Sequence, residues 1–156
     1  RMEPVFLDGR FSFFIDYAHN AMALESLLKT VKEYATGRVI CIFGCGGNRS
    51  KDRRFEMGEV SGKLADLTII TTDNPRFEEP KDIMKDIETG ILKTDGKYVM
   101  VEDRKEAVRY AIENAMDKDM IILAGKGHED YQEIRGVKYH MDERELVEGV
   151  WKERNV

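Results

Sequence analysis

Short apolar runs alternate along the chain with stretches in which apolar residues recur at helical spacing. Most of these runs have no alternation of apolar and polar positions, which is typical of strands buried on both faces of a parallel sheet. Strands separated by amphipathic helices predict an α/β fold with helices on both faces of the sheet, a three-layer α/β/α arrangement. The predicted strands lie at residues 11–15, 39–43, 67–71, 98–101 and 120–124.

The helices predicted between these strands have recognisable ends. Asn20 precedes a run with helical spacing and is a suitable N-cap residue, and Pro80 suits the first turn of another helix. A helix at about residues 52–65 is weakened by Gly58 and Gly62, because glycine has a low helix propensity. The same spacing predicts further helices around residues 107–115 and 146–151.

Two hairpins are also predicted. Asp8-Gly9 separates the apolar runs at residues 5–7 and 11–15, and Asp-Gly is a preferred turn between antiparallel strands. Gly136 lies in the middle of a small hairpin at residues 131–140. The chain therefore combines a mainly parallel sheet with a hairpin near each end.

Four polar loops each follow a predicted strand. Right-handed crossovers bring the carboxyl ends of parallel strands to one edge of the sheet, where open α/β sheets bind ligands. We therefore expect these loops to form one site. They are Asp16–His19, Gly44–Arg49, Asp73–Arg76 and Gly125–Glu129.

Composition narrows the class of protein. A chain of 156 residues with 42% hydrophobic residues suits one globular domain. Its net charge of −5 argues against general nucleic-acid binding. No apolar run approaches the ~20 residues of a membrane span, and no signal peptide opens the chain. Because the chain begins at Arg1, it reads as one domain of a larger protein.

Cys41 and Cys45 are too few for a structural zinc site without a nearby histidine, so we expect no metal site. They read as reduced thiols of a cytoplasmic protein.

The glycine-rich loop does not complete a nucleotide-binding motif. A dinucleotide fingerprint or a P-loop that starts at Gly44 needs glycine where Arg49 stands. A nucleotide-binding Rossmann domain is therefore disfavoured. Arg49 instead supplies a cation at the end of a loop whose glycines permit close backbone approach.

The chemistry of the other loops fits recognition rather than catalysis. Pro75 restrains Asn74 and Arg76, whose donors suit a carboxylate, and Glu129 suits an ammonium. Together they fit the zwitterionic end of an amino acid. The alternative is an ordinary Asp-Asn-Pro turn beside a solvated arginine.

Lys126 and His128 are the candidate catalytic side chains of the last loop, but the sequence shows no partnered nucleophile, so we expect no catalytic residue in this chain.

Five ordered motifs that span the chain resemble the C-terminal domain of the Mur ligases, in the MurE-type branch that makes UDP-N-acetylmuramoyl-tripeptide with meso-diaminopimelate. The motifs are Arg1-Met2-Glu3, Asp16-Tyr17-Ala18-His19, Gly44-Cys45-Gly46-Gly47-Asn48-Arg49, Asp73-Asn74-Pro75-Arg76 and Gly125-Lys126-Gly127-His128-Glu129-Asp130-Tyr131-Gln132. Residues 1–156 would then form one Rossmann-like domain with a six-stranded sheet and an antiparallel first strand. The UDP-binding and central ATP-binding domains would lie outside this chain.

The resemblance implies an ATP-dependent acid–amino-acid ligase of peptidoglycan precursor synthesis. ATP and Mg²⁺, held mainly by the central domain, would activate the carboxylate of UDP-MurNAc-L-Ala-D-Glu as an acyl phosphate. The amine of meso-diaminopimelate, delivered by the C-terminal domain, would attack it. This domain alone should be inactive.

The resemblance also assigns residues to ligands. Arg1 and Asp16 match residues that contact ATP. The residues that match the meso-diaminopimelate site are Arg49, Asp73, Asn74, Pro75, Arg76, Gly125 and Glu129. The runner-up hypothesis is a stand-alone amino-acid-binding or regulatory module, which would have no need of Arg1 and Asp16 to face another domain's ATP.

Overall fold

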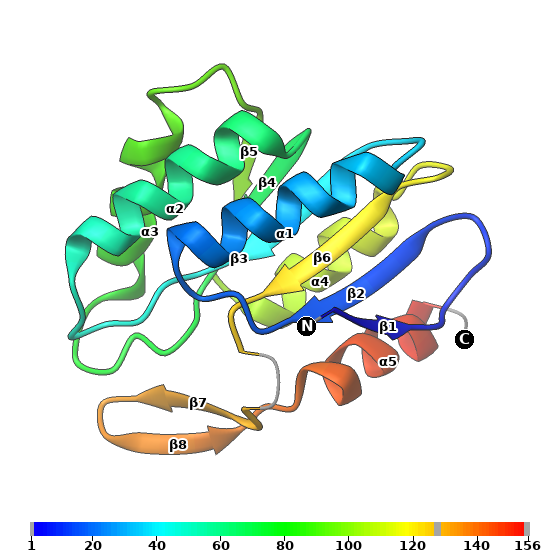
Figure 1. The fold of residues 1–156 in the computed structure, drawn as a ribbon. Coiled ribbons are helices and arrows are strands. Elements are labelled where there is room, and N and C mark those ends of the chain that lie inside the picture. The colour runs from blue at the N-terminus through cyan, green and yellow to red at the C-terminus, as the bar shows by residue number, and fades with distance from the viewer. Residues whose placement is uncertain (1, 127–128, 155–156) are drawn as a thin grey trace.

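The fold is a six-stranded sheet between two helical layers, with a separate hairpin (Figure 1). The computed structural model describes residues 2–126 and 129–154. Spatial order in the sheet is β1-β2-β6-β3-β4-β5, and every neighbouring pair except β1–β2 is parallel. The strands are β1 Glu3–Val5, β2 Ser12–Asp16, β3 Val39–Phe43, β4 Leu67–Ile70, β5 Tyr98–Met100 and β6 Met120–Ala124. The α/β prediction and the antiparallel first strand are confirmed.

The opening hairpin differs in detail from its prediction. Its first strand is Glu3–Val5, and Val5 pairs with Phe13. Of the predicted run at residues 5–7, only Val5 is in the strand, because that register leaves the chain beyond Val5 outside the sheet, where Phe6 is 91% exposed. Asp8-Gly9 lies inside this longer connection, and Asp8 accepts a hydrogen bond from the Arg10 backbone N–H at 2.8 Å.

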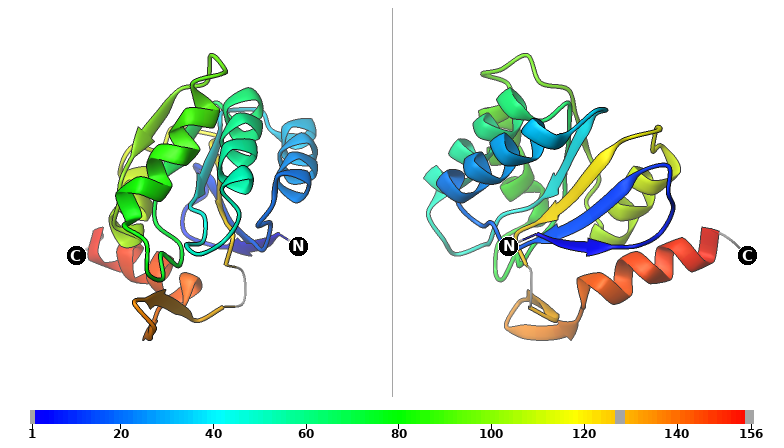
Figure 2. Two further views of the ribbon diagram at one scale, coloured as in Figure 1. Left: turned by 90° about the vertical axis from the view of Figure 1, so that its left-hand side faces the viewer. Right: turned by 45° about the vertical axis from the view of Figure 1, so that its right-hand side comes forward.

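Helices cover both faces of the sheet, as Figure 2 shows from two sides. Helices α1, α2 and α3 contribute buried apolar residues to one core, and α4 and α5 contribute them to the other. None of the helices in the described ranges is long and apolar enough to cross a membrane. The helices are α1 Ala21–Tyr34, α2 Lys51–Leu64, α3 Pro80–Ile91, α4 Arg104–Glu113 and α5 Glu143–Arg154.

Helix ends follow the sequence closely. The Asn20 side chain accepts a hydrogen bond from the Ala23 backbone N–H at 2.8 Å, so the predicted N-cap of α1 is confirmed. Asp142 likewise accepts from the Glu145 N–H at 3.0 Å before α5.

The glycines of α2 have a packing role that propensity alone does not reveal. A Cβ at Gly58 would lie 2.2 Å from the Ile87 carbonyl oxygen of α3, and one at Gly62 would lie 2.3 Å from Thr94 Oγ1. A side chain at Gly58 would push the two helices apart, and one at Gly62 would displace the Thr94 side chain just after α3. The close approach of α2 to α3 therefore requires glycine, and α2 forms despite its low propensity.

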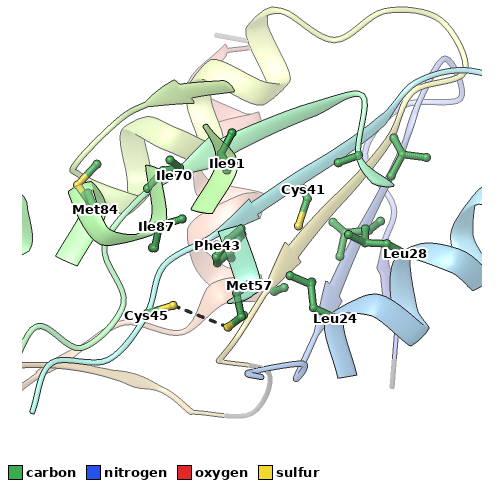
Figure 3. Packing of buried hydrophobic residues seen from close by; sticks show 14 of the residues in the cluster. Leu24, Leu28, Cys41, Phe43, Cys45, Met57, Ile70, Met84, Ile87 and Ile91 are labelled. Carbon is green, nitrogen blue, oxygen red and sulfur yellow. Dashed lines mark hydrogen bonds between the residues drawn. The ribbon is translucent and has the colours of Figure 1, made fainter. Parts of the chain in front are cut away.

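The core on the α1–α3 side contains both cysteines (Figure 3). Cys41 and Cys45 are unoxidised and buried, and Cys45 Sγ lies 3.7 Å from Met57 Sδ. Burial raises the pKa of each thiol to about 12. Both therefore pack as small apolar side chains rather than as reactive thiolates.

The predicted second hairpin is also confirmed, as β7 Tyr131–Ile134 and β8 Val137–His140. It forms its own two-stranded sheet, beyond the end at which β6 leaves the main sheet (Figure 1). An isolated bridge joins Ile134 of β7 to Arg76. The hairpin therefore reaches the loop that follows β4.

Candidate functional site

The four loops singled out in the sequence line one cavity of about 260 Å³. They leave β2, β6, β3 and β4, which are consecutive neighbours in the sheet. Six predicted ligand-binding residues line it: Arg49, Asp73, Asn74, Arg76, Gly125 and Glu129. Pro75 is buried, and its carbonyl oxygen lies against Gly47.

Tyr17, His19 and Arg53 also line the cavity, although none of them was predicted individually as a ligand-binding residue. Arg53 belongs to a run of basic residues in the sequence, Arg49, Lys51, Arg53 and Arg54, and this run was the signal that could have identified it. Tyr17 and His19 belong to the loop after β2, and their rings meet edge-on with centroids 5.3 Å apart. The cavity thus has aromatic, cationic and anionic walls.

Asn74 is held by hydrogen bonds on both sides of its amide. Its Oδ1 accepts from Lys126 Nζ at 2.8 Å and from the Glu133 backbone N–H at 2.9 Å. Its Nδ2 donates to Glu129 Oε1 at 3.4 Å. Asn74 is only 3% exposed, and these hydrogen bonds hold its amide with the amino group toward Glu129.

Arg76 adopts a left-handed backbone conformation, with φ of 53°, that is uncommon for a residue with a side chain. Backbone hydrogen bonds to the hairpin hold it there: Arg76 N–H donates to Glu133 O at 3.1 Å, and Arg135 N–H donates to Arg76 O at 2.7 Å. Its guanidinium donates to Gly47 O at 3.1 Å and pairs with Glu133 at 3.4 Å. The guanidinium therefore already contacts two groups of the protein, and the side chain still lines the cavity.

The glycine-rich loop packs directly on the Asp73–Arg76 turn. A Cβ at Gly44 would lie 2.5 Å from Thr71 O, and one at Gly47 would lie 1.8 Å from Pro75 O. Gly47 N–H also donates to Asn74 O at 2.7 Å. We expected these glycines to allow close approach to a ligand, but what the structure shows is close approach of two loops.

Arg49 is exposed at the end of the glycine loop, and its Nη1 donates to the neighbouring carbonyl of Asn48 at 3.0 Å. Beneath the loop, the buried Arg54 donates to Gly46 O at 3.2 Å and pairs with Glu78 at 2.6 Å. The hydrogen bond from Arg54 holds the pKa of the Glu78 carboxyl below its usual value. An ion pair thus supports the loop from below.

The loop after β6 contains the conformationally demanding Gly125, whose φ is 115°. Its N–H donates to Asp16 O at 3.0 Å. The next residue, Lys126, has no exposed surface and forms ion pairs with Asp73 at 2.9 Å and Glu129 at 3.7 Å. A lysine so enclosed is poorly placed to act as a nucleophile. His128 and Gly127 lie outside the described residues.

A buried ion pair fixes the start of two site loops. Arg104 of α4 pairs with Glu143 of α5 at 2.5 Å, and both side chains are fully buried. Arg104 also donates to Thr72 O at 2.9 Å and to Ala124 O at 3.1 Å. These carbonyls immediately precede Asp73 and Gly125. Nothing in the sequence pairs two residues 39 positions apart.

Asp16 borders a second hollow of about 560 Å³ that Tyr17 and His19 share with the first. It is 5% exposed, and its Oδ1 accepts from Ala18 N–H at 3.3 Å. Carboxylate oxygens accept hydrogen bonds, so Asp16 suits a ligand that presents hydroxyl groups. Arg1, the other residue expected to contact ATP, lies outside the described residues.

Across residues 2–126 and 129–154, no group of three or more His, Cys, Asp and Glu side chains is placed to hold a metal ion.

Comparison with known proteins gives concordant matches. The family model described as "Mur ligase, glutamate ligase domain" matches residues 1–127. A UDP-N-acetylmuramoyl-L-alanyl-D-glutamate--2,6-diaminopimelate ligase from Caldanaerobacter subterraneus is 52% identical over 153 residues, which cover 98% of this chain and 32% of the relative. The ligase of that name from Clostridium botulinum is 48% identical over 139 residues, or 89% of this chain and 28% of the relative.

A solved structure of a ligase with this name matches the whole chain with a TM-score of 0.93 and 36% identity. The match covers 32% of that structure's chain. The present chain therefore spans about a third of the length of the relatives it matches.

Proposed function

The chain belongs to the Mur ligase family and corresponds to its C-terminal domain, and from this we propose that it is the amino-acid-binding domain of an ATP-dependent ligase. The substrates would be UDP-MurNAc-L-Ala-D-Glu and meso-diaminopimelate, and the product an amide bond in a peptidoglycan precursor. Relatives that are 48% and 52% identical to this chain carry the name of that ligase.

The observation that carries the proposal is the division of charge around one cavity. Arg49, Arg53 and Arg76 line it together with Asp73 and Glu129. A zwitterion needs both signs at a fixed separation, and guanidinium groups bind carboxylates through paired donors. We assign the ligand carboxylate to Arg49, Asn74 and Arg76, and its ammonium to Glu129 and Gly125.

Asp16 supports an ATP-facing role for the adjoining hollow. Its carboxylate is positioned at the end of β2, and the hollow runs along the first turns of α1. We propose that Asp16 accepts hydrogen bonds from ribose hydroxyls and that Arg1 meets the phosphates. ATP, when bound with Mg²⁺ by the domains outside this chain, supplies the phosphoryl group that activates the substrate carboxylate. The reaction would take place in the cytoplasm.

Selectivity for meso-diaminopimelate follows from the same charges. L-Lysine lacks the distal carboxylate, so the donors of Arg49 and Arg76 at the cavity would have no ligand anion to bind. Hydrogen bonds to charged groups contribute ~1.5–3 kcal/mol each, which corresponds to roughly 10- to 100-fold in affinity. The cavity should therefore reject lysine by electrostatics rather than by size.

Calorimetric titration of this domain with meso-diaminopimelate and with L-lysine tests the proposal. We expect meso-diaminopimelate to bind at least ~10-fold more tightly, and Arg76→Ala to abolish that preference by removing a charged donor. The matched control is Arg109→Ala, because Arg109 lies on α4 away from the cavity. Equal binding of the two amino acids, or an Arg76→Ala variant that keeps the preference, would contradict the assignment.

A stand-alone amino-acid-binding module on the same fold is the other candidate. It is not favoured, because the relatives are about three times as long and are named as ligases.

A further inference from the structure

Lys126 is a fully buried lysine that contacts three residues of the cavity wall, Asn74, Asp73 and Glu129. Its ammonium lies 2.8 Å from Asn74 Oδ1, 2.8 Å from Tyr131 O and 2.9 Å from Asp73 Oδ1. Its Nζ donates hydrogen bonds to Asn74 Oδ1 and Tyr131 O, and it forms an ion pair with Asp73 that is not a hydrogen bond. Burying a charge is costly unless it is paired and hydrogen-bonded, and here both conditions are met.

The partners of Lys126 determine which way the Asn74 amide faces. Asn74 Oδ1 accepts from Lys126 Nζ and, at 2.9 Å, from the Glu133 backbone N–H. A flipped amide would turn its own N–H groups against both of these donors. The hydrogen-bond network thus assigns Nδ2 to the opposite side, 3.4 Å from Glu129 Oε1. On that side it is available to a ligand carboxylate.

Lys126 also adjusts the negative charge of the cavity wall. Asp73 and Glu129 both line the cavity, and Lys126 Nζ is closer to Asp73, at 2.9 Å, than to Glu129, at 3.7 Å. One cation thus offsets one of two carboxylates, chiefly Asp73. The remaining negative charge, on the Glu129 side, matches a single ammonium.

These contacts join three separate segments. Lys126 follows β6, Asn74 and Asp73 follow β4, and the Tyr131 carbonyl belongs to β7. Asn74, which Lys126 holds, also accepts a hydrogen bond from the Glu133 N–H of β7. The backbone hydrogen bond from Arg135 to Arg76 O does not involve Lys126. One part of the hairpin's attachment therefore depends on Lys126 and the other does not.

We propose that Lys126 is a positioning residue of this site, which holds the Asn74 amide with its N–H donors toward the cavity and offsets Asp73 so that Glu129 is left for a ligand ammonium. The part of this inference that concerns a ligand rests on the proposed function, because the ligand is the same amino acid. The orientation of Asn74 can be tested without any ligand.

The test compares Lys126→Met, which keeps the length of the side chain but removes its charge and donors, with the unaltered chain. Backbone hydrogen exchange is measured by NMR at two amides of the hairpin. We expect protection of the Glu133 amide, which donates to Asn74, to fall ~10-fold, which corresponds to ~1.4 kcal/mol, about the contribution of one hydrogen bond. The Arg135 amide, which donates to Arg76 O, should keep its protection.

Calorimetry on the same variant supplies the second readout. We expect affinity for meso-diaminopimelate to fall at least ~10-fold more than affinity for L-lysine, because the Asn74 donor acts on a carboxylate that lysine lacks, whereas the charge beside Glu129 acts on the ammonium of both. Lys105→Met is the matched control: Lys105 is an exposed lysine of α4, paired with Glu153. It should change neither readout.

Loss of protection at both amides would show that Lys126 merely clamps the hairpin, and unchanged protection at both would show that it does not hold Asn74. Either result overturns the inference. An equal loss of affinity for both amino acids would also overturn it. If the unaltered chain shows no preference for meso-diaminopimelate, the proposed function fails, while the exchange comparison still decides whether Lys126 positions Asn74.

Discussion

Single residues fix how closely the two most important loops of the site approach each other. Gly47 donates its N–H to Asn74 O at 2.7 Å, and a Cβ there would lie 1.8 Å from Pro75 O. Since backbone rather than a flexible side chain lies opposite, the loops would have to separate. The turn that presents Asn74 and Arg76 therefore depends on a residue that does not itself line the cavity.

Gly47→Ala is expected to destabilise the domain by ~1–3 kcal/mol, the usual cost of overpacking a tight contact, and to weaken meso-diaminopimelate binding. Gly9→Ala is the matched control, because a Cβ at Gly9 has no atom within 4 Å. Urea denaturation of both variants measures the effect. Equal stability of the two variants would show that the loops can part without cost.

The ion pair beneath the glycine loop makes stability depend on pH. Glu78 has a pKa lowered by Arg54, so the folded state favours its ionised form. Its contribution is fully present above the unfolded-state pKa of about 4.3 and is lost as the pH falls through the lower folded-state pKa. The difference in free energy of unfolding between the unaltered chain and Glu78→Gln should therefore shrink below about pH 4. A difference that stays constant from pH 6 to pH 3 in denaturation experiments would contradict this.

Among the elements, α4 and α5 do more than cover one face of the sheet. Arg104 at the start of α4 pairs with Glu143 at the start of α5 and donates to the carbonyls of Thr72 and Ala124. These contacts connect the first turns of α4 and α5 to the backbone just before the loops that follow β4 and β6. The pair couples the helical layer to the site's backbone.

Breaking this pair from one side should be costly. Arg104→Met leaves the Glu143 carboxylate buried without its cation, and such changes cost ~3–5 kcal/mol. The double variant Arg104→Met/Glu143→Leu should recover much of that loss, because it removes the stranded charge. Arg109→Met, at an ion pair on the surface of α4, should cost clearly less. Urea denaturation of all three decides, and a double variant that is no more stable than Arg104→Met would contradict the explanation.

Predictability from the sequence differs between elements for physical reasons. The N-cap at Asn20 and the helix at Pro80 were readable because caps act within a few residues. The first strand was misplaced by its hydrophobic run, since register against β2 rather than hydrophobicity sets where it ends. Gly58 and Gly62 were interpreted as residues that weaken α2, because helix propensity depends on nearby sequence and does not include packing against the segment at α3.

At the scale of the whole molecule, strand order assembles the site. Motif-bearing loops follow β2, β3, β4 and β6, and the sheet places these four strands side by side with β6 between β2 and β3. The sequence could predict that their carboxyl ends share an edge, which follows from right-handed crossovers. It could not predict that β6 inserts there, nor that Lys126 and Asn74, 52 positions apart, would meet.

The most direct measurement is an NMR titration of the isotopically labelled domain with meso-diaminopimelate. If the four loops form one amino-acid site, backbone shifts should concentrate in the loops after β2, β3, β4 and β6 and at Glu133 of the hairpin. The hollow at the opposite edge of the sheet, lined by Arg38, Lys63 and Lys97, is the internal control, because it offers charged groups without the paired loops. Saturable shifts confined to the loop edge are predicted. Shifts that cluster at the Arg38 edge, or that spread evenly over the surface, would contradict the central claim that this cavity recognises the amino acid.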